Sequence, residues 1–134
     1  KIHGYNEGDA RAALVIGDNF EQLSTDQTIM GAPFRFLGRR DQIGGQQFTR
    51  EIWMSEEQFQ SFWVLVYSDG LWNMLSPEQM TPNDSTTGPK SLCDVLVATA
   101  LSVREPYGKT LGDDKVTTGD DNITIAAFHC KVVN

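Results

Sequence analysis

The chain is organised around the stretch Trp63-Val64-Leu65-Val66-Tyr67-Ser68-Asp69-Gly70-Leu71-Trp72-Asn73. Its first half is a run of β-branched and aromatic residues typical of a buried strand, and the Asp-Gly pair that follows predicts an abrupt turn. A side chain at the end of a buried strand is held rigidly while it faces solvent, which suits a metal ligand or a catalytic carboxylate. Asp-Gly is also among the commonest turn dipeptides, so Asp69 has two interpretations, a ligand or only a turn residue.

Length and charge restrict the class of protein. The 134 residues are about one ordinary domain. A net charge of −7 argues against nucleic acid as a partner and suits metal cations. No apolar run approaches the roughly 20 residues of a membrane span and no signal-like segment opens the chain, so we expect no membrane association. Because the first residue is Lys1 rather than Met, we expect further sequence upstream.

The two cysteines, Cys93 and Cys130, fall in a predicted helix and a predicted strand. Their spacing is not that of metal ligands, and two thiols make no disulfide framework. We therefore expect small, buried, unpaired cysteines in an intracellular, reducing compartment, either the cytoplasm or the nucleus.

Hydrophobic patterning predicts strands over 10–16, 20–23, 48–54, 63–67 and 122–132, with residues 1–6 as a short lead. Strands that follow one another usually pair, so we expect 48–54 to lie beside 63–67. The first half of the last strand is apolar on both faces, which predicts a central strand covered on both sides.

Two helices are predicted. Ser76-Pro77-Glu78-Gln79 has the form of a capping box with proline at the first helical position, and Pro82 keeps the helix short. A second helix over about 90–104 should bury a stripe in the core, and 105–121 should be a loop. The stripe consists of Leu92, Val95, Leu96, Thr99, Ala100 and Val103.

Three aspartates stand at strand boundaries: Asp9, Asp69 and Asp121. If neighbouring strands bring these three aspartates together, their carboxylate oxygens form a set of hard ligands. Such ligands favour Mg²⁺ or Mn²⁺. The alternative is that each aspartate only makes its turn. His3 and His129 are isolated, and no serine nucleophile motif is present.

A basic cluster lies in the irregular region between the second and third predicted strands. Guanidinium groups match phosphate oxygens, so phosphate recognition is one interpretation of the cluster, but an ordinary solvated loop is the favoured one. Its members are Arg35, Arg39 and Arg40.

Four blocks then carry a family resemblance. They are Gly8-Asp9-Ala10-Arg11-Ala12, Leu23-Ser24-Thr25-Asp26-Gln27, Ser68-Asp69-Gly70-Leu71-Trp72 and Asp121-Asn122-Ile123-Thr124. In order and rough spacing they resemble the type 2C metal-dependent protein phosphatases. The resemblance implies an α+β fold, an antiparallel β-sandwich flanked by helices, with a metal centre at one end. It also implies that residues 1–134 are the C-terminal half of a single catalytic domain.

The resemblance assigns roles to the aspartates. Asp69 and Asp121 look like ligands of a catalytic metal pair of Mg²⁺ or Mn²⁺, and Asp9 resembles the ligand of a weaker third ion. Family members hydrolyse phosphoserine and phosphothreonine in protein substrates without a covalent intermediate, by direct attack of a water that bridges two metals.

The chain departs from the family pattern in several places. The Asp-Gly-His-Gly-Gly block, the upstream acidic ligand and the phosphate-binding arginine are absent. Asn73 stands where many members have an aspartate, Gln27 replaces a common histidine, and Ala10 replaces the usual serine. The segment 28–47 is shorter than the usual flap, of which Phe36-Leu37-Gly38 is a candidate remnant.

Three hypotheses follow. The chain is part of a metal-dependent Ser/Thr phosphatase whose N-terminal half is supplied by the same protein or a partner chain. Alternatively, it is a catalytically inactive phosphatase-like module for regulation or interaction. A third hypothesis is an acidic domain that binds divalent cations. Because two or three aspartates hardly make a tight binuclear site, we expect the 134-residue chain alone not to hydrolyse phosphoesters.

Overall fold

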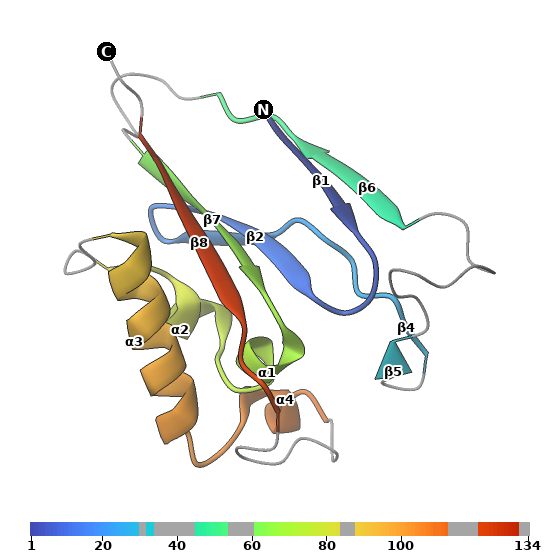
Figure 1. The fold of residues 1–134 in the computed structure, drawn as a ribbon, viewed down its shortest axis with the longest axis vertical. Coiled ribbons are helices and arrows are strands. Elements are labelled where there is room, and N and C mark those ends of the chain that lie inside the picture. The colour runs from blue at the N-terminus through green and yellow to red at the C-terminus, as the bar shows by residue number, and fades with distance from the viewer. Residues whose placement is uncertain (30–31, 34–44, 54–60, 84–87, 113–120, 132–134) are drawn as a thin grey trace.

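The computed structural model describes residues 1–29, 32–33, 45–53, 61–83, 88–112 and 121–131. Within them the chain has an α+β fold of antiparallel strands and short to medium helices (Figure 1). The strands are β1 (Ile2–Asn6), β2 (Arg11–Ile16), β3 (Asn19–Gln22), β4 (Thr28–Ile29), β5 (Ala32–Pro33), β6 (Gln46–Arg50), β7 (Ser61–Tyr67) and β8 (Ile125–Lys131). The helices are α1 (Asp69–Trp72), α2 (Pro77–Met80), α3 (Pro89–Ser102) and α4 (Tyr107–Thr110).

The main sheet has four antiparallel strands in the order β3-β2-β7-β8. The predicted strand over 63–67 is confirmed as part of β7, which lies between β2 and β8. Tyr67, the last residue of β7, is opposite Arg11 of β2 on one side and Ile125 of β8 on the other. The segments that leave β7 and enter β2 and β8 therefore meet at the same end of the sheet.

The hydrophobic core lies between one face of this sheet and helix α3. Leu65 and Tyr67 are almost fully buried there, together with three α3 residues at positions i, i+4 and i+8, Leu92, Leu96 and Ala100. The helical stripe is thus confirmed at these positions. The prediction is wrong for Val95, which is 56% exposed. Val95 lies three positions after Leu92, and its side chain points away from the row of α3 residues that faces the sheet.

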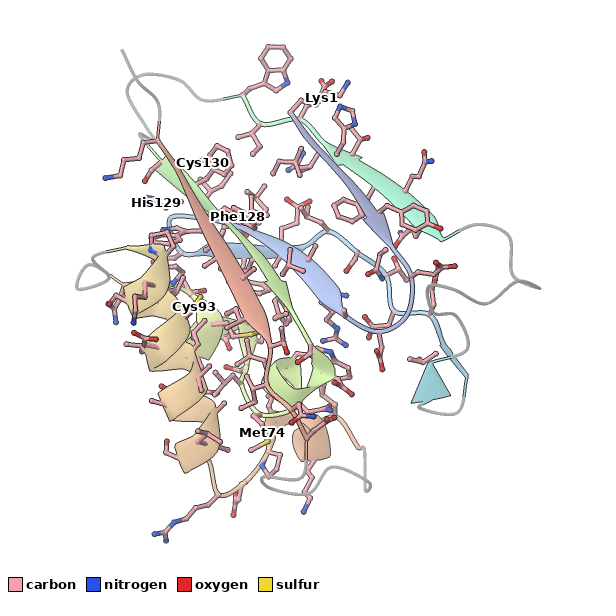
Figure 2. All side chains as sticks on the ribbon, viewed as in Figure 1. Lys1, Met74, Cys93, Phe128, His129 and Cys130 are labelled. Carbon is pink, nitrogen blue, oxygen red and sulfur yellow. The ribbon has the colours of Figure 1, made fainter. Side chains whose placement is uncertain are left out.

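The opposite face of β7 and β8 is apolar and partly open. Val66 and Phe128 point to this face and are 43% and 55% exposed. Figure 2 shows Phe128 and its neighbour His129 on opposite sides of β8. The prediction of a central, doubly covered last strand is wrong for the described residues, because β8 pairs only with β7 and forms the edge of the sheet.

β1 and β6 form a separate two-stranded antiparallel sheet. The residues expected to be an irregular lead are therefore a strand, and the pairing expected between 48–54 and 63–67 is wrong. Gly4 allows the β1–β6 contact, because a Cβ at this position would lie 2.0 Å from Cζ of Phe48. A glycine that weakens the strand signal in the sequence thus makes room for an aromatic ring in the fold.

The short helices refine the remaining predictions. α1 replaces the turn expected after β7, and α4 interrupts the expected loop over 105–121. The capping box of α2 is confirmed: the Gln79 N–H donates to Ser76 Oγ at 3.4 Å, and the Ser76 N–H donates to Gln79 Oε1 at 2.9 Å.

Cys93 in α3 and Cys130 in β8 are free thiols, and each is half-buried. No helix in the described part of the chain has the length and apolar character needed to cross a membrane. The Arg35/Arg39/Arg40 cluster and the candidate flap remnant Phe36-Leu37-Gly38 lie outside the described residues.

Candidate functional site

The three predicted aspartates lie at the same end of the main sheet. Asp69 is the first residue of α1, directly after β7, and is half-buried. Asp9 is half-buried in the connection from β1 to β2, and Asp121 is exposed in the segment that enters β8. This convergence follows from the antiparallel register, which places the end of β7 beside the starts of β2 and β8.

A close contact joins the segments that carry Asp69 and Asp121. Beyond the last ladder pair, the Ser68 N–H donates to the Thr124 carbonyl at 3.0 Å, which extends the β7–β8 pairing past Tyr67. Gly70 lies so close to the second segment that an added Cβ would come within 2.4 Å of the Asn122 carbonyl oxygen. The glycine of the Asp-Gly pair is thus required for close approach of the two chains.

Electrostatics couples the three carboxylates. Burial raises the pKa of Asp69 above its ordinary value, and the negative charges of Asp121 and Asp9 raise it further, as does a side-chain hydrogen bond with Asp121. The Gly70 N–H acts in the opposite direction, since it donates to Asp69 Oδ1 at 2.9 Å. The site therefore concentrates negative charge that a bound cation would neutralise.

The donor set fits a hard divalent cation in part. Asp69 and Asp121 supply adjacent carboxylate oxygens, the ligand type that Mg²⁺ and Mn²⁺ prefer. However, among the residues that the structure describes, no three His, Cys, Asp or Glu side chains are grouped closely enough to hold one metal ion. The fold thus brings Asp121 and Asp9 close enough to Asp69 for their charges to raise its pKa, and the ligand roles stay predictions.

The backbone at Asp9 is fixed by an aromatic and ionic arrangement. Trp72 of α1 donates its Nε1–H to the Asp9 carbonyl at 3.2 Å. The guanidinium carbon of Arg11 lies 3.6 Å from the centroid of the Trp72 ring, a cation–π contact. Arg11 also makes a bidentate ion pair with Asp26, with Nε to Oδ1 at 2.9 Å and Nη2 to Oδ2 at 2.5 Å. Arg11 is therefore committed to the fold, not free to bind phosphate.

Gln27, which replaces a histidine common in the family that the sequence resembles, holds the turn before Asp9. Its backbone N–H donates to the Gly8 carbonyl at 2.9 Å, and its side-chain Oε1 accepts the Gly8 N–H at 3.2 Å. Gly8 has φ of 104°, in the region that favours glycine. Gln27 thus has a structural role beside the predicted site.

Asn73, another position at which the sequence differs from the family that it resembles, has an unusual environment. It follows α1, and its backbone N–H donates to the Asp69 carbonyl at 2.9 Å. Its side-chain Oδ1 is buried without a hydrogen-bond partner among the described residues. A buried, unpaired oxygen is costly, and an aspartate at the same position would carry its charge one helical turn from Asp69.

Sequence reasoning missed Ser68, Arg11 and Trp72 as parts of this arrangement. Each lies in a block that carries the family resemblance, so the signal was present as residue identity. The contacts of Ser68 and Trp72 join segments 54 and 63 positions apart, and the Arg11–Asp26 ion pair spans 15 positions, so local patterns do not reveal them.

A separate cavity of about 540 Å³ lies at the other end of the sheet. Its lining includes Ser61 and Trp63 at the start of β7 and His129 near the end of β8, whose ring is stacked on that of Trp63 at 4.0 Å. The aspartates lie at the opposite ends of these two strands, so this cavity is distinct from the candidate site.

Comparison with known proteins gives support at the level of the fold. No protein-family model matches the chain, and no curated protein matches it in sequence. The chain is similar in structure to the PPM Ser-Thr phosphatase MsPP from Mycobacterium smegmatis, solved in complex with cacodylate, with a TM-score of 0.61 and 17% sequence identity. The match covers 93% of this chain and 53% of that one, so the chain spans about half the length of MsPP. The fold is therefore like that of a PPM phosphatase.

Proposed function

We propose that this chain is the C-terminal part of a metal-dependent protein serine/threonine phosphatase domain. The observation that carries the proposal is that the antiparallel register brings Asp69 and Asp121, which lie beside two strands far apart in sequence, close enough for the charge of Asp121 to raise the pKa of Asp69. The likeness of the fold to a PPM Ser-Thr phosphatase supports the same interpretation. The substrates proposed are proteins that carry phosphoserine or phosphothreonine.

In this proposal Asp69 and Asp121 hold Mg²⁺ or Mn²⁺, and Asp9 serves a further, weaker site. Bound divalent cations supply a lowered pKa for water and neutralise charge on the transferring phosphoryl group. The chain's own contribution is to hold the exposed carboxylate of Asp121 close to the half-buried carboxylate of Asp69, so that cation binding relieves their mutual repulsion.

The remaining ligands come from outside the described residues in this proposal. Two adjacent carboxylates are too few for a binuclear site, since Mg²⁺ and similar ions need about six oxygen ligands each. We propose that the N-terminal half of the domain, on the same protein or a partner chain, supplies them. The partial coverage of MsPP, 53% of its length, leaves room for such a half.

The open apolar face of β7 and β8 favours the proposal that a further layer of structure packs on the sheet. Val66 and Phe128 are half-exposed side by side with Val64 and Ala126 on that face. Exposed apolar sheet surface of this kind marks an interaction site. We propose that the N-terminal half packs on it and completes a β-sandwich.

Metal binding tests the proposal directly. In the full-length protein, Mn²⁺ titration followed by calorimetry should detect binding, and Asp69→Asn and Asp121→Asn should each weaken it by about tenfold or more. Asp18→Asn, in the exposed turn at the other end of the sheet, is the matched control and should bind like the unsubstituted protein. Absence of Mn²⁺ binding by the unsubstituted protein would remove the proposal.

Turnover provides the second test. The full-length protein should release phosphate from a phosphothreonine peptide in the presence of Mn²⁺, and Asp69→Asn should abolish this release. The 134-residue chain by itself should not hydrolyse p-nitrophenyl phosphate with Mn²⁺, because its ligand set is incomplete. Turnover by the chain alone would show that the site needs no second half.

A catalytically inactive phosphatase-like module is the second candidate. It is favoured by Asn73, whose buried amide oxygen is unpaired where the family often places a carboxylate. This candidate predicts that the full-length protein binds Mn²⁺ weakly or not at all and releases no phosphate, although it folds and recognises a partner.

A further inference from the structure

Ser68 is the N-cap residue of α1, but its side chain does not cap that helix. A serine at this position ordinarily accepts a hydrogen bond from a backbone N–H in the first turn. Ser76 does so at the start of α2, where its Oγ accepts the Gln79 N–H. The Ser68 hydroxyl has another use, which requires a different explanation.

The Ser68 hydroxyl instead bridges to the segment that carries Asp121. Its Oγ–H donates to the Asn122 carbonyl at 3.1 Å, and its Oγ accepts the Thr124 N–H at 3.0 Å. With the backbone bond from the Ser68 N–H to the Thr124 carbonyl, Ser68 makes three hydrogen bonds to residues 122–124. These bonds are the first contacts beyond the Tyr67–Ile125 pair that ends the ladder.

The bridge lies between the two carboxylates. Ser68 directly precedes Asp69, and Asn122 directly follows Asp121 and donates its N–H to Asp121 Oδ1 at 2.8 Å. A change in the separation of residues 68 and 122 therefore moves the two carboxylates relative to each other. Loss of a group that orients a metal ligand typically weakens metal affinity by about 10- to 100-fold.

We infer that Ser68 is a positioning residue, whose hydroxyl sets the spacing of Asp69 and Asp121 for a shared divalent cation. This inference rests on the proposed function, because it assigns the two aspartates to a metal site. Ser68 itself contacts neither carboxylate in the hydrogen bonds described above, so its action passes through the backbone of residues 122–124.

The test compares two serines that both lie at helix N-termini. Ser68→Ala removes the bridge but keeps the backbone bond to Thr124, whereas Ser76→Ala removes an ordinary helix cap. In the full-length protein, Ser68→Ala should weaken Mn²⁺ binding by about tenfold or more, and Ser76→Ala should leave it unchanged although it lowers the melting temperature. Ser68→Thr keeps the hydroxyl and should restore the affinity.

A second measurement reports geometry without metal. In NMR spectra, Ser68→Ala should lose the close contacts between Gly70 and Asn122 while contacts along the β7–β8 ladder persist. Equal Mn²⁺ affinities in the Ser68→Ala and unsubstituted proteins would overturn the role of Ser68 and leave the metal site standing. Failure of the unsubstituted protein to bind Mn²⁺ would overturn the proposed function, and the role of Ser68 with it.

Discussion

At the scale of single residues, Asp69 should destabilise the metal-free fold at neutral pH. Its pKa is raised in the folded state by burial and by the charges of Asp121 and Asp9, so ionising Asp69 costs more free energy in the folded state than in the unfolded chain. Stability from this group is full below its ordinary pKa and is lost as the pH rises through the raised value. Asp69→Asn should therefore be more stable than the unsubstituted protein at pH 7 in EDTA, by urea unfolding.

The asparagine variant is a clean probe because its Oδ1 can still accept the Gly70 N–H. The difference in unfolding free energy should shrink as the pH falls through the raised pKa toward the ordinary value, because the folded protein then binds the proton and loses the cost of the buried charge. Asp18→Asn, in an exposed turn, is the control and should not change the pH dependence in this way. An Asp69→Asn protein that is less stable at pH 7 than the unsubstituted one would contradict the prediction.

Asn73→Asp should strengthen metal binding. The substitution replaces a buried, unpaired amide oxygen with a carboxylate one helical turn after Asp69. Since affinity for divalent cations rises with the number of carboxylate ligands, Mn²⁺ should bind about tenfold more tightly, measured by calorimetry. Asn19→Asp adds the same charge at the other end of the sheet and should have no such effect. Unchanged affinity in Asn73→Asp would place residue 73 outside the metal site.

Some residues of the candidate site could be predicted from the sequence, and others are revealed only by the fold. Asp69 and Asp121 could be singled out because carboxylates at the ends of apolar strands form a local pattern. Ser68 could not, because a serine before a helix is ordinarily a cap, and only the fold shows its hydroxyl reaching residues 122–124. The role of Arg11 was hidden for the same reason, since its partners Trp72 and Asp26 come from other elements.

At the scale of elements, the start of α1 must pass very close to the segment entering β8. A Cβ on Gly70 would lie 2.4 Å from the Asn122 carbonyl oxygen, and backbone on both sides leaves little room to adjust. Gly70→Ala should destabilise the protein by about 1–3 kcal/mol through this overlap, measured by thermal or urea unfolding. It should also weaken Mn²⁺ binding, because it pushes the start of α1, with Asp69, away from the segment that holds Asp121.

Gly88→Ala is the control for this substitution. Gly88 precedes α3, has extended backbone, and an added Cβ there meets nothing within 4 Å. Its stability should change by about 1 kcal/mol or less, with no effect on Mn²⁺ binding. Equal destabilisation by the two substitutions would mean that the contact with Asn122 is not the cause.

Elements with local signals were predictable, and their partners were not. β7, the capping box of α2 and the buried positions of α3 follow from strand composition, a four-residue motif and helical spacing. The pairing of β6 with β1 depends on Gly4 making room for Phe48, more than 40 positions away. The edge position of β8 is likewise decided by which other strands the sheet contains, which its own apolar residues do not encode.

At the scale of the whole molecule, a substitution on the open face of β7 and β8 can show whether this face is free or covered in the full-length protein. Phe128 is 55% exposed in this structure, so Phe128→Asp should change the stability of the 134-residue chain by only about 0.5 kcal/mol. If the N-terminal half of the domain covers this face, the same aspartate is buried against apolar groups. The full-length protein should then lose about 3 kcal/mol or more, measured by urea unfolding.

Val95→Asp provides the matched control for Phe128→Asp. Val95 is apolar and 56% exposed, but it lies on α3, to the side of the row that packs on the sheet. Val95→Asp should change stability little in both the 134-residue chain and the full-length protein, since the proposed half does not cover α3. A similarly small effect of Phe128→Asp in both forms would mean that nothing packs on this face. The remaining metal ligands would then have to approach Asp69 and Asp121 from another direction.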